Sequence, residues 1–161
     1  MQNLKPLYQI TSDSNLSYTE KMAALLQLGV DYFQLELGII SEIESENYTV
    51  RHAISPDNSL IAGTVFTLAD TYCVHTLANN QALSFYHAGN SHIAQHPCYL
   101  NFGLESYIGA PLLVEGNRFG TINFSASAAR TQPFSEEEHD FIEILSHWVG
   151  NEIARHEKLT L

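Results

Sequence analysis

The side chains best suited to chemistry in this chain are a cysteine and a histidine close together near its middle. Cys73 follows Tyr72 and precedes His75 by two residues, in the string DTYCVHTL (70–77). A thiol beside an imidazole can bind a metal, act as a nucleophile or contact a polar ligand. The alternative is structural, with Cys73 a small buried hydrophobic residue and His75 a helix-surface or capping group. A tyrosine, a cysteine and a histidine on one short helix suit a contact surface, so we expect the ligand contacts of this segment to be Asp70, Tyr72, Cys73 and His75.

A second group of potential ligands crowds the stretch from residue 87 to residue 105. Its members are His87, His92, His96 and Cys98. The spacing of four residues between His92 and His96 would place both on one face of a helix. Neither of the strong metal-binding spacings, C-x-x-C or H-E-x-x-H, is present, so scattered loop histidines are the simpler interpretation. A haem or metal sensor is a further hypothesis, and its ligands would be His75, His92, His96 and Cys98.

Polar side chains also alternate with apolar ones along the strand expected near residue 122. Asn123 and Ser125 share one face of that strand, because successive side chains of a strand point to opposite faces. If this face lines a cavity, the two residues would orient a ligand, whereas on a solvent face they are ordinary amphipathic alternation. Tyr107 and Gly109 pose the same question on the neighbouring strand. All four are candidate ligand-binding residues.

The composition limits the kinds of ligand and partner. The 161 residues provide material for one domain, and 45% of them are apolar, which is enough for a packed core. The formal net charge of −11 argues against nucleic acid and anionic membranes as partners. Between Lys21 and Arg130 the only fixed cations are Arg51 and Arg118. We therefore expect a neutral, zwitterionic or aromatic ligand rather than a phosphorylated one.

Nothing in the sequence indicates export or membrane insertion. No basic segment followed by an apolar core opens the chain, and no apolar run reaches the length of a membrane span. Two cysteines do not make a disulfide framework for a domain of this size. We therefore expect a cytoplasmic protein or the cytoplasmic part of a larger one.

Two long helices are predicted near the ends of the chain. Capping boxes mark their starts, and the pairs are Ser17 with Glu20 and Ser135 with Glu138. Apolar stripes at helical spacing follow over 16–34 and 135–159. The second stripe surrounds Trp148 and continues further than packing on one sheet requires, which favours a dimerisation and signalling helix.

Between the helices the pattern changes to that of strands. The predicted elements are hairpins over 37–45 with 48–54 and over 107–114 with 118–125, strands over 64–68 and 82–86, a short helix over 70–77 capped by Asp70, and a helical turn over 97–102. Every strand pair that can be assigned is a hairpin, so we expect an α+β fold with an antiparallel sheet of about six strands within 37–126. The terminal helices would cover one face and the irregular segment 70–105 the other, with a ligand site beneath that segment.

Four segments, in this order, resemble the GAF family over nearly the whole chain. They are LELGIISEIE (35–44), VFTLADTYCVHTL (65–77), HPCYLNFGLESYIGAPLLVEGNRFGTINFSA (96–126) and QPFSEEEHDFIEIL (132–145). The part from Phe102 to Phe124 is the most specific, and it is similar to GAF domains attached to bacterial histidine kinases and diguanylate cyclases. The resemblance implies one PAS/profilin-like domain over 1–161, a sensor that binds a small ligand or a partner. Such a domain is usually a homodimer through its terminal helices and reports to an output domain, and its cofactor stays unknown.

The family also contains enzymes and photoreceptors, which gives two alternatives. Free methionine-(R)-sulfoxide reductases are single GAF domains with reactive thiols, and Cys98 and Cys73 lie near the corresponding segments. That group's Gly-Val-Cys-Gly and Gly-His-Ile-Ala-Cys-Asp stretches are absent, and only histidines are near to activate a thiol. Bilin attachment is disfavoured, because the motifs Cys-His and Asp-x-Cys-Phe are both missing. We therefore expect no enzymatic activity, with the reductase as the alternative.

Overall fold

The computed structural model describes residues 4–159. Its central element is an antiparallel sheet. Within these residues, six strands lie in the order β3-β2-β1-β6-β5-β4, and each neighbouring pair is antiparallel. The strands are β1 (Leu37–Glu44), β2 (Asn47–Ile54), β3 (Val65–Thr67), β4 (Leu83–Phe85), β5 (Ser106–Val114) and β6 (Asn117–Ala126). Both predicted hairpins are confirmed, and they meet where β1 pairs with β6 in the middle of the sheet.

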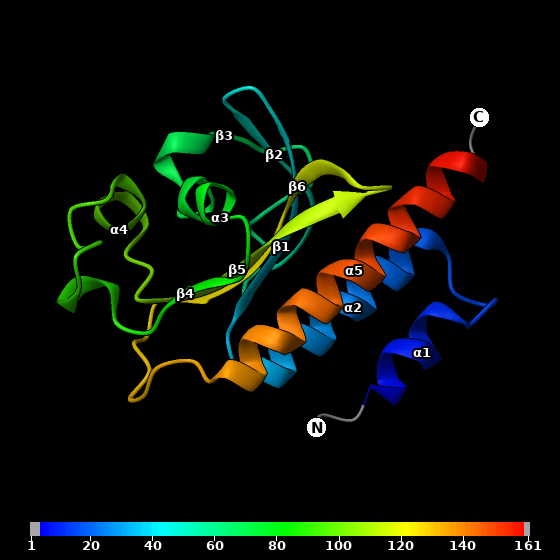
Figure 1. The fold of residues 1–161 in the computed structure, drawn as a ribbon, viewed down its shortest axis with the longest axis horizontal. Helices are drawn as coiled ribbons and strands as arrows, with labels where there is room; N and C mark the ends of the chain where they lie inside the picture. Colours follow the sequence, from blue (N-terminus) through cyan, green and yellow to red (C-terminus); the bar gives the residue numbers. More distant parts are fainter. Residues whose placement is uncertain (1–3, 160–161) are drawn as a thin grey trace.

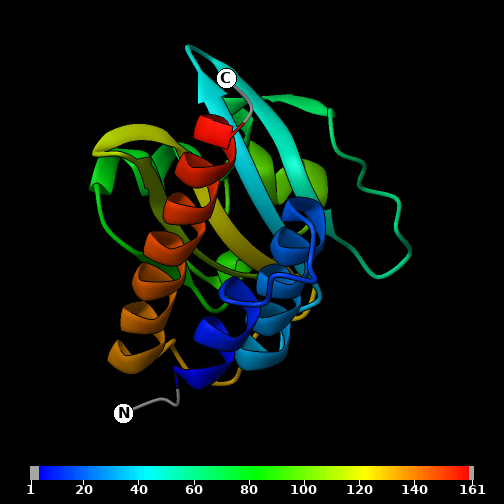
Figure 2. The ribbon, with the colours of Figure 1, turned by 90° about the vertical axis from the view of Figure 1, so that its right-hand side faces the viewer.

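The helices on one face of this sheet are α1 (Lys5–Thr11), α2 (Tyr18–Phe33) and α5 (Glu136–Leu159) (Figure 1). α2 and α5 lie side by side against the strands, and α1 packs on their outer side (Figure 2). The predicted capping boxes are present: Ser17 with Glu20 starts α2, and Ser135 with Glu138 starts α5. α1 is absent from the predicted elements, because its N-terminus has no capping side chain. No helix between residues 4 and 159 combines the length and apolar character needed to cross a lipid bilayer.

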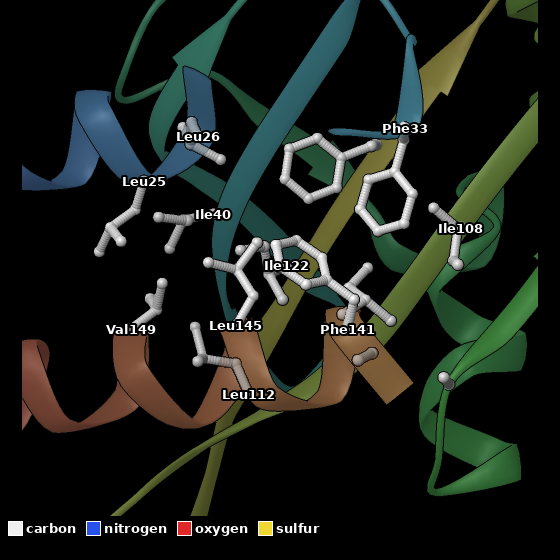
Figure 3. Close-up of a cluster of buried hydrophobic side chains, with 14 of the residues drawn as sticks. Leu25, Leu26, Phe33, Ile40, Ile108, Leu112, Ile122, Phe141, Leu145 and Val149 are labelled. Atoms are coloured by element: carbon white, nitrogen blue, oxygen red, sulfur yellow. The ribbon is translucent and has the colours of Figure 1, made fainter. Parts of the chain in front are cut away.

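The space between the helices and the sheet is filled by the larger of two apolar cores (Figure 3). Fully buried side chains from three elements meet there: Leu25 and Leu26 of α2, Leu145 and Val149 of α5, and Ile122 of β6. The spacing of four residues along α5 places Leu145 and Val149 on the same helical face. Burying an aliphatic side chain of this size contributes about 1.5–3 kcal/mol. This core, hereafter the helix-side core, holds α2 and α5 on the sheet.

The opposite face of the sheet is covered by shorter segments, which are η1 (Leu68–Asp70), α3 (Cys73–Asn79), η2 (Ala88–Asn90) and α4 (Pro97–Phe102). A smaller apolar core, hereafter the cavity-side core, lies beneath them and includes Tyr72, Phe85 and Tyr107. The predicted arrangement, with the terminal helices on one face and the segment 70–105 on the other, is therefore confirmed.

The short helix of this segment begins later than predicted. Asp70 ends the 3-10 turn η1 and does not cap α3, whose N-cap residue Tyr72 makes no side-chain capping bond. The cause is local, since Thr71 is extended (φ −112°, ψ 155°) and its hydroxyl donates to Leu68 O at 2.8 Å. The backbone therefore turns once before α3 starts, and this turn brings Tyr72 and Cys73 into buried positions over the sheet.

Candidate functional site

A cavity of about 360 Å³ lies between the second face of the sheet and the segments that cover it. Residues of β1, β5 and β6 form its floor, and β2, β3, the start of α3, the two ends of α4 and the loop after β2 surround it. Ligand cavities in proteins commonly measure about 300–1,000 Å³, so this one suits a small metabolite. It lies beneath the segment 70–105, where the site was expected.

Asn123 holds the inner end of the cavity together. Its Nδ2 donates to Tyr48 OH at 3.0 Å and to Cys73 Sγ at 3.3 Å. The same nitrogen lies 3.3 Å from Thr121 Oγ1, which in turn is 2.8 Å from Ser41 Oγ. These five residues are all buried. Because their polar groups satisfy one another, these residues form one connected hydrogen-bond network at this end of the cavity.

Tyr107 joins this network to α3. Its hydroxyl lies 2.7 Å from Thr76 Oγ1 and 3.3 Å from Cys73 Sγ. Burial is the main reason why the pKa of Tyr107 is raised well above its usual value, and the same holds for the pKa of Tyr48. Both phenols are therefore neutral at physiological pH, so each hydroxyl can donate or accept a hydrogen bond.

Ser125 contributes a polar group without a partner. The residue is 1% exposed, and its Oγ makes no hydrogen bond to any part of the chain between residues 4 and 159. Like Asn123, it lines the cavity, whereas Ile122 and Phe124 belong to the helix-side core. The alternation along β6 thus directs its polar pair toward the cavity and not toward solvent.

Two carboxylates line the mouth of the cavity. Glu36 Oε1 accepts hydrogen bonds from the Ser127 N–H at 3.1 Å and the Ser127 hydroxyl at 3.0 Å. Asp57 Oδ1 accepts from the Ser59 N–H at 3.1 Å, and the hydrogen bonds with Ser59 lower the pKa of Asp57. Both acidic residues are exposed, and of the described residues no Lys or Arg lines the cavity. The site is therefore acidic at its mouth and uncharged inside.

Most of the predicted ligand-binding residues are brought together here. Those that line the cavity are Tyr72, Cys73, Tyr107, Asn123 and Ser125. They come from three separate elements, namely the start of α3, β5 and β6. The pattern of tyrosine, thiol and alternating polar residues thus marks the polar part of one cavity.

Asp70, His75 and Gly109 lie outside the cavity lining. Asp70 belongs to η1, before the chain turns toward the cavity. His75 is exposed on α3, because two residues of helix rotate its side chain by about 200° from that of buried Cys73. The side chain of Tyr107 covers Gly109, since a β-carbon there would overlap the tyrosine hydroxyl. Tyr107 therefore takes the place in the cavity wall that was expected for Gly109.

The apolar part of the cavity was not predicted. It includes Leu37 and Ile39 of β1, Phe66 of β3 and Phe102 of α4. The ring centroid of Phe66 lies 5.7 Å from that of Phe102 and 6.1 Å from that of Tyr48, which makes an aromatic wall. The alternation of Leu37 and Ile39 was an available signal, but the place of Phe102 depends on how α4 folds back over the sheet.

The predicted metal ligands do not converge. In the part of the chain that the structure describes, no three His, Cys, Asp or Glu side chains are placed to hold a metal ion. The rings of His75 and His96 are 4.9 Å apart between centroids, but His96 Nδ1 accepts the Cys98 N–H at 3.0 Å. His92 instead lies against Phe85, with 6.0 Å between ring centroids. His96 therefore caps α4, and the expected set of His75, His92, His96 and Cys98 is not assembled.

Both cysteines line the cavity as free, buried thiols. Burial raises the pKa of Cys98 to about 12, and burial also raises the pKa of Cys73. The thiolate is the reactive form of cysteine, so neither residue is activated as a nucleophile. Cys73 instead takes part in the hydrogen bonds that link Asn123, Thr121 and Tyr107.

The same fold occurs in proteins of known structure. The GAF domain of a phosphoenolpyruvate-protein phosphotransferase from Acinetobacter has a TM-score of 0.76 and 15% identity, over 99% of each chain. The phycocyanobilin-bound GAF domain of a cyanobacterial phytochrome has a TM-score of 0.74 and 16% identity, over 96% of each chain. A free methionine-R-sulfoxide reductase from Neisseria meningitidis, in complex with its substrate, has a TM-score of 0.71 and 11% identity, over 95% of this chain and 87% of that one.

At these identities the likeness shows a common fold alone. Among curated proteins, no sequence is significantly similar to this chain. The family model of the GAF domain, in contrast, matches residues 18–153, from the start of α2 to the last turns of α5. The matched part includes the whole sheet and every element around the cavity. This chain therefore belongs to the GAF family.

Proposed function

We propose that this chain is a regulatory sensor domain that binds a small molecule in the cavity and transmits binding through its terminal helices. The observation that supports the proposal is the position of β6 between the two cores. Asn123 and Ser125 of this strand face the cavity, whereas Ile122 and Phe124 pack into the helix-side core. A ligand that displaces the cavity side of β6 therefore also displaces residues that hold α2 and α5.

Transmission requires that the ligand bind two arrangements of the helices with different affinity. We propose that α2 and α5 also form a homodimer interface, since Ile144 and Trp148 of α5 remain only partly buried in the single chain. In this proposal α5 leads to an output domain in the cytoplasm, of the histidine kinase or diguanylate cyclase type. The GAF domains of a phytochrome and of a phosphotransferase have the same fold and support a regulatory role.

A pair of neighbouring residues provides a matched test. Leu60 lines the cavity, whereas Ile61 is 66% exposed and does not. Leu60→Trp should fill the mouth of the cavity, and Ile61→Trp adds the same bulk next to it. Hydrogen exchange in α2 and α5 is measured with and without a metabolite extract, together with native mass spectrometry of the freshly purified protein.

We expect the wild type and Ile61→Trp to carry a small-molecule adduct, or to show slower exchange in α2 and α5 with the extract. Leu60→Trp should show neither effect. If the extract slows hydrogen exchange in α2 and α5 equally in both variants, the small molecule binds outside the cavity. The absence of any adduct or protection in the wild type would contradict the sensor function.

A thiol-dependent reductase is the second candidate, because Cys73 and Cys98 line one cavity. The raised pKa of each thiol argues against it, since both are protonated at neutral pH. The test is turnover of free methionine sulfoxide by the wild type beside Cys98→Ser. Turnover that depends on Cys98 would favour the reductase over the sensor.

A further inference from the structure

The charge around the cavity has one sign. Glu36 and Asp57 line its mouth, and neither makes an ion pair with any residue between 4 and 159. The cations on β2 and β6 do not line the cavity: Arg51 pairs with Glu42, and Arg118 donates to a backbone carbonyl of α3. A mouth that carries carboxylates and no Lys or Arg attracts cations and repels anions.

Ser125 is an independent indication of a ligand at the same place. Ser125 lines the cavity, and its buried Oγ has no hydrogen-bond partner among the described residues. Leu37 pairs with Ser125 across β1 and β6, and the Glu36 N–H donates to Ser125 O at 3.3 Å. The free hydroxyl and the carboxylate therefore come from adjoining positions. A buried hydroxyl without a partner is rare in proteins, and a hydrogen-bonding group of a ligand would satisfy it.

The remainder of the cavity is suited to an apolar body. Ile39, Phe66 and Phe102 line it, and the rings of Phe66 and Phe102 meet edge to face. Aromatic rings pack well against apolar groups and also attract cations over their faces. The volume of about 360 Å³ limits the ligand to the size of a small metabolite.

Together these features extend the proposed function, on which this inference rests. We propose that the cavity selects a small organic amine, with its protonated nitrogen between Glu36 and Ser125. Its apolar or aromatic body lies against Ile39 and Phe66. A carboxylate or phosphate ligand of the same size would bring its charge to two carboxylates, and no guanidinium or ammonium lines the cavity to bind it.

Three probes of similar size test this preference: phenethylamine, phenethyl alcohol and phenylacetate. They share a phenyl ring and differ in the head group, which is an ammonium, a hydroxyl or a carboxylate at pH 7. Isothermal titration calorimetry at low salt gives the three dissociation constants. We expect phenethylamine to bind about fivefold more tightly than the alcohol, which is the range of a partly exposed ion pair, and phenylacetate to bind most weakly.

Charge variants locate the preference within the chain. Glu36→Gln should raise the dissociation constant of phenethylamine about fivefold and leave that of phenethyl alcohol unchanged. Glu44→Gln changes the net charge equally at the other end of β1, about 25 Å away, and should leave both dissociation constants unchanged. Ser125→Ala should weaken the binding of phenethylamine about fivefold, because the hydrogen bond to the ammonium group is lost.

The proposal is overturned if phenylacetate binds as tightly as phenethylamine, if the two Glu→Gln variants behave alike, or if no probe binds. Binding of the alcohol without preference for the amine would also overturn the ligand class. That last result would leave the sensor function intact, because the cavity would still accept a small molecule.

Discussion

The ring of Phe124 on β6 occupies the space in which Gly29 of α2 would carry a side chain. Phe124 is fully buried, and a β-carbon built at Gly29 would overlap several atoms of its ring. The same ring also lies against the backbone of Gly38 on β1. α2 therefore approaches the sheet more closely than a helix with alanine at this position could.

Gly29→Ala should destabilise the domain. In an unhindered helix this change stabilises by about 1 kcal/mol, whereas overpacking of a core costs about 1–3 kcal/mol. Chemical denaturation measures the free energy of unfolding. Phe124→Leu makes room for the methyl group, so the double variant should be more stable than the sum of the two single effects predicts. Strictly additive effects would contradict the close contact.

Ser125→Ala and Ser41→Ala should have opposite effects on stability. Both serines are buried in the same sheet, but Ser41 Oγ lies 2.8 Å from Thr121 Oγ1, and Ser125 Oγ has no partner within 4–159. Removing the unpartnered hydroxyl should raise the free energy of unfolding of the ligand-free domain by about 1 kcal/mol, whereas Ser41→Ala should lower it by about 1–3 kcal/mol. A loss of stability in Ser125→Ala would mean that its hydroxyl has a structural role.

Tyr107→Phe should cost more stability than Tyr99→Phe. The Tyr107 hydroxyl is buried between Thr76 and Cys73, and its removal leaves a buried partner unsatisfied, at about 1–3 kcal/mol. Tyr99 donates to Glu105 at 2.8 Å but is only partly buried, so water can replace its hydroxyl. Thermal unfolding of the two variants checks the order, and equal losses would contradict the buried network.

Acidification should destabilise the domain through His52. Burial, followed by the charges of Arg51 and His156, lowers the pKa of His52. The unfolded chain therefore takes up a proton at a higher pH than the folded one. The stability that neutral His52 contributes is complete above pH 6.5, its ordinary pKa, and falls as the pH drops below about 6.5.

The melting temperature between pH 8 and pH 5 measures this effect. His52→Gln should flatten the loss below pH 6.5, and His147→Gln, at an exposed position of α5, should not. Identical profiles for His52→Gln and the wild type would assign the loss to other groups, such as His96, whose pKa is lowered by burial and by His75.

Cys98 should resist alkylation in the folded domain. Its pKa of about 12 leaves very little thiolate at pH 8, so iodoacetamide should label it roughly a thousandfold more slowly than in the urea-unfolded chain. Mass spectrometry of the labelled peptides follows the reaction. Rapid labelling of native Cys98 would show an activated thiol and would favour the reductase.

The elements that could be predicted are those with a local signal. Ser17 and Ser135 start helices through hydrogen bonds three residues away, and both were identified from spacing. Asp70 had the right residue type for a cap, but the extended Thr71 separates it from α3. The start of α3 is set by tertiary packing and not by a local motif, because Tyr72 turns inward to pack against Phe85 and Tyr107.

The site was predictable only in its polar part. Asn123 and Ser125 alternate with apolar residues, so their common face was clear, but only the packing of Phe124 against α2 decides which face meets the cavity. Glu36 gave no signal, since it is a single exposed carboxylate directly before β1. Its role at the mouth depends on Ser127, which lies far away in the sequence and holds its carboxylate.

The two cores of the described domain have no buried residue in common. The buried residues of the cavity-side core can therefore change in evolution while those of the helix-side core, which hold the helices, stay the same. Under the proposed function, such changes would alter the ligand and leave the packing of α2 and α5 intact, because they alter side chains on a single face of the sheet. The constraint concentrates on β6, where adjacent residues serve different cores, so this strand should tolerate the fewest substitutions.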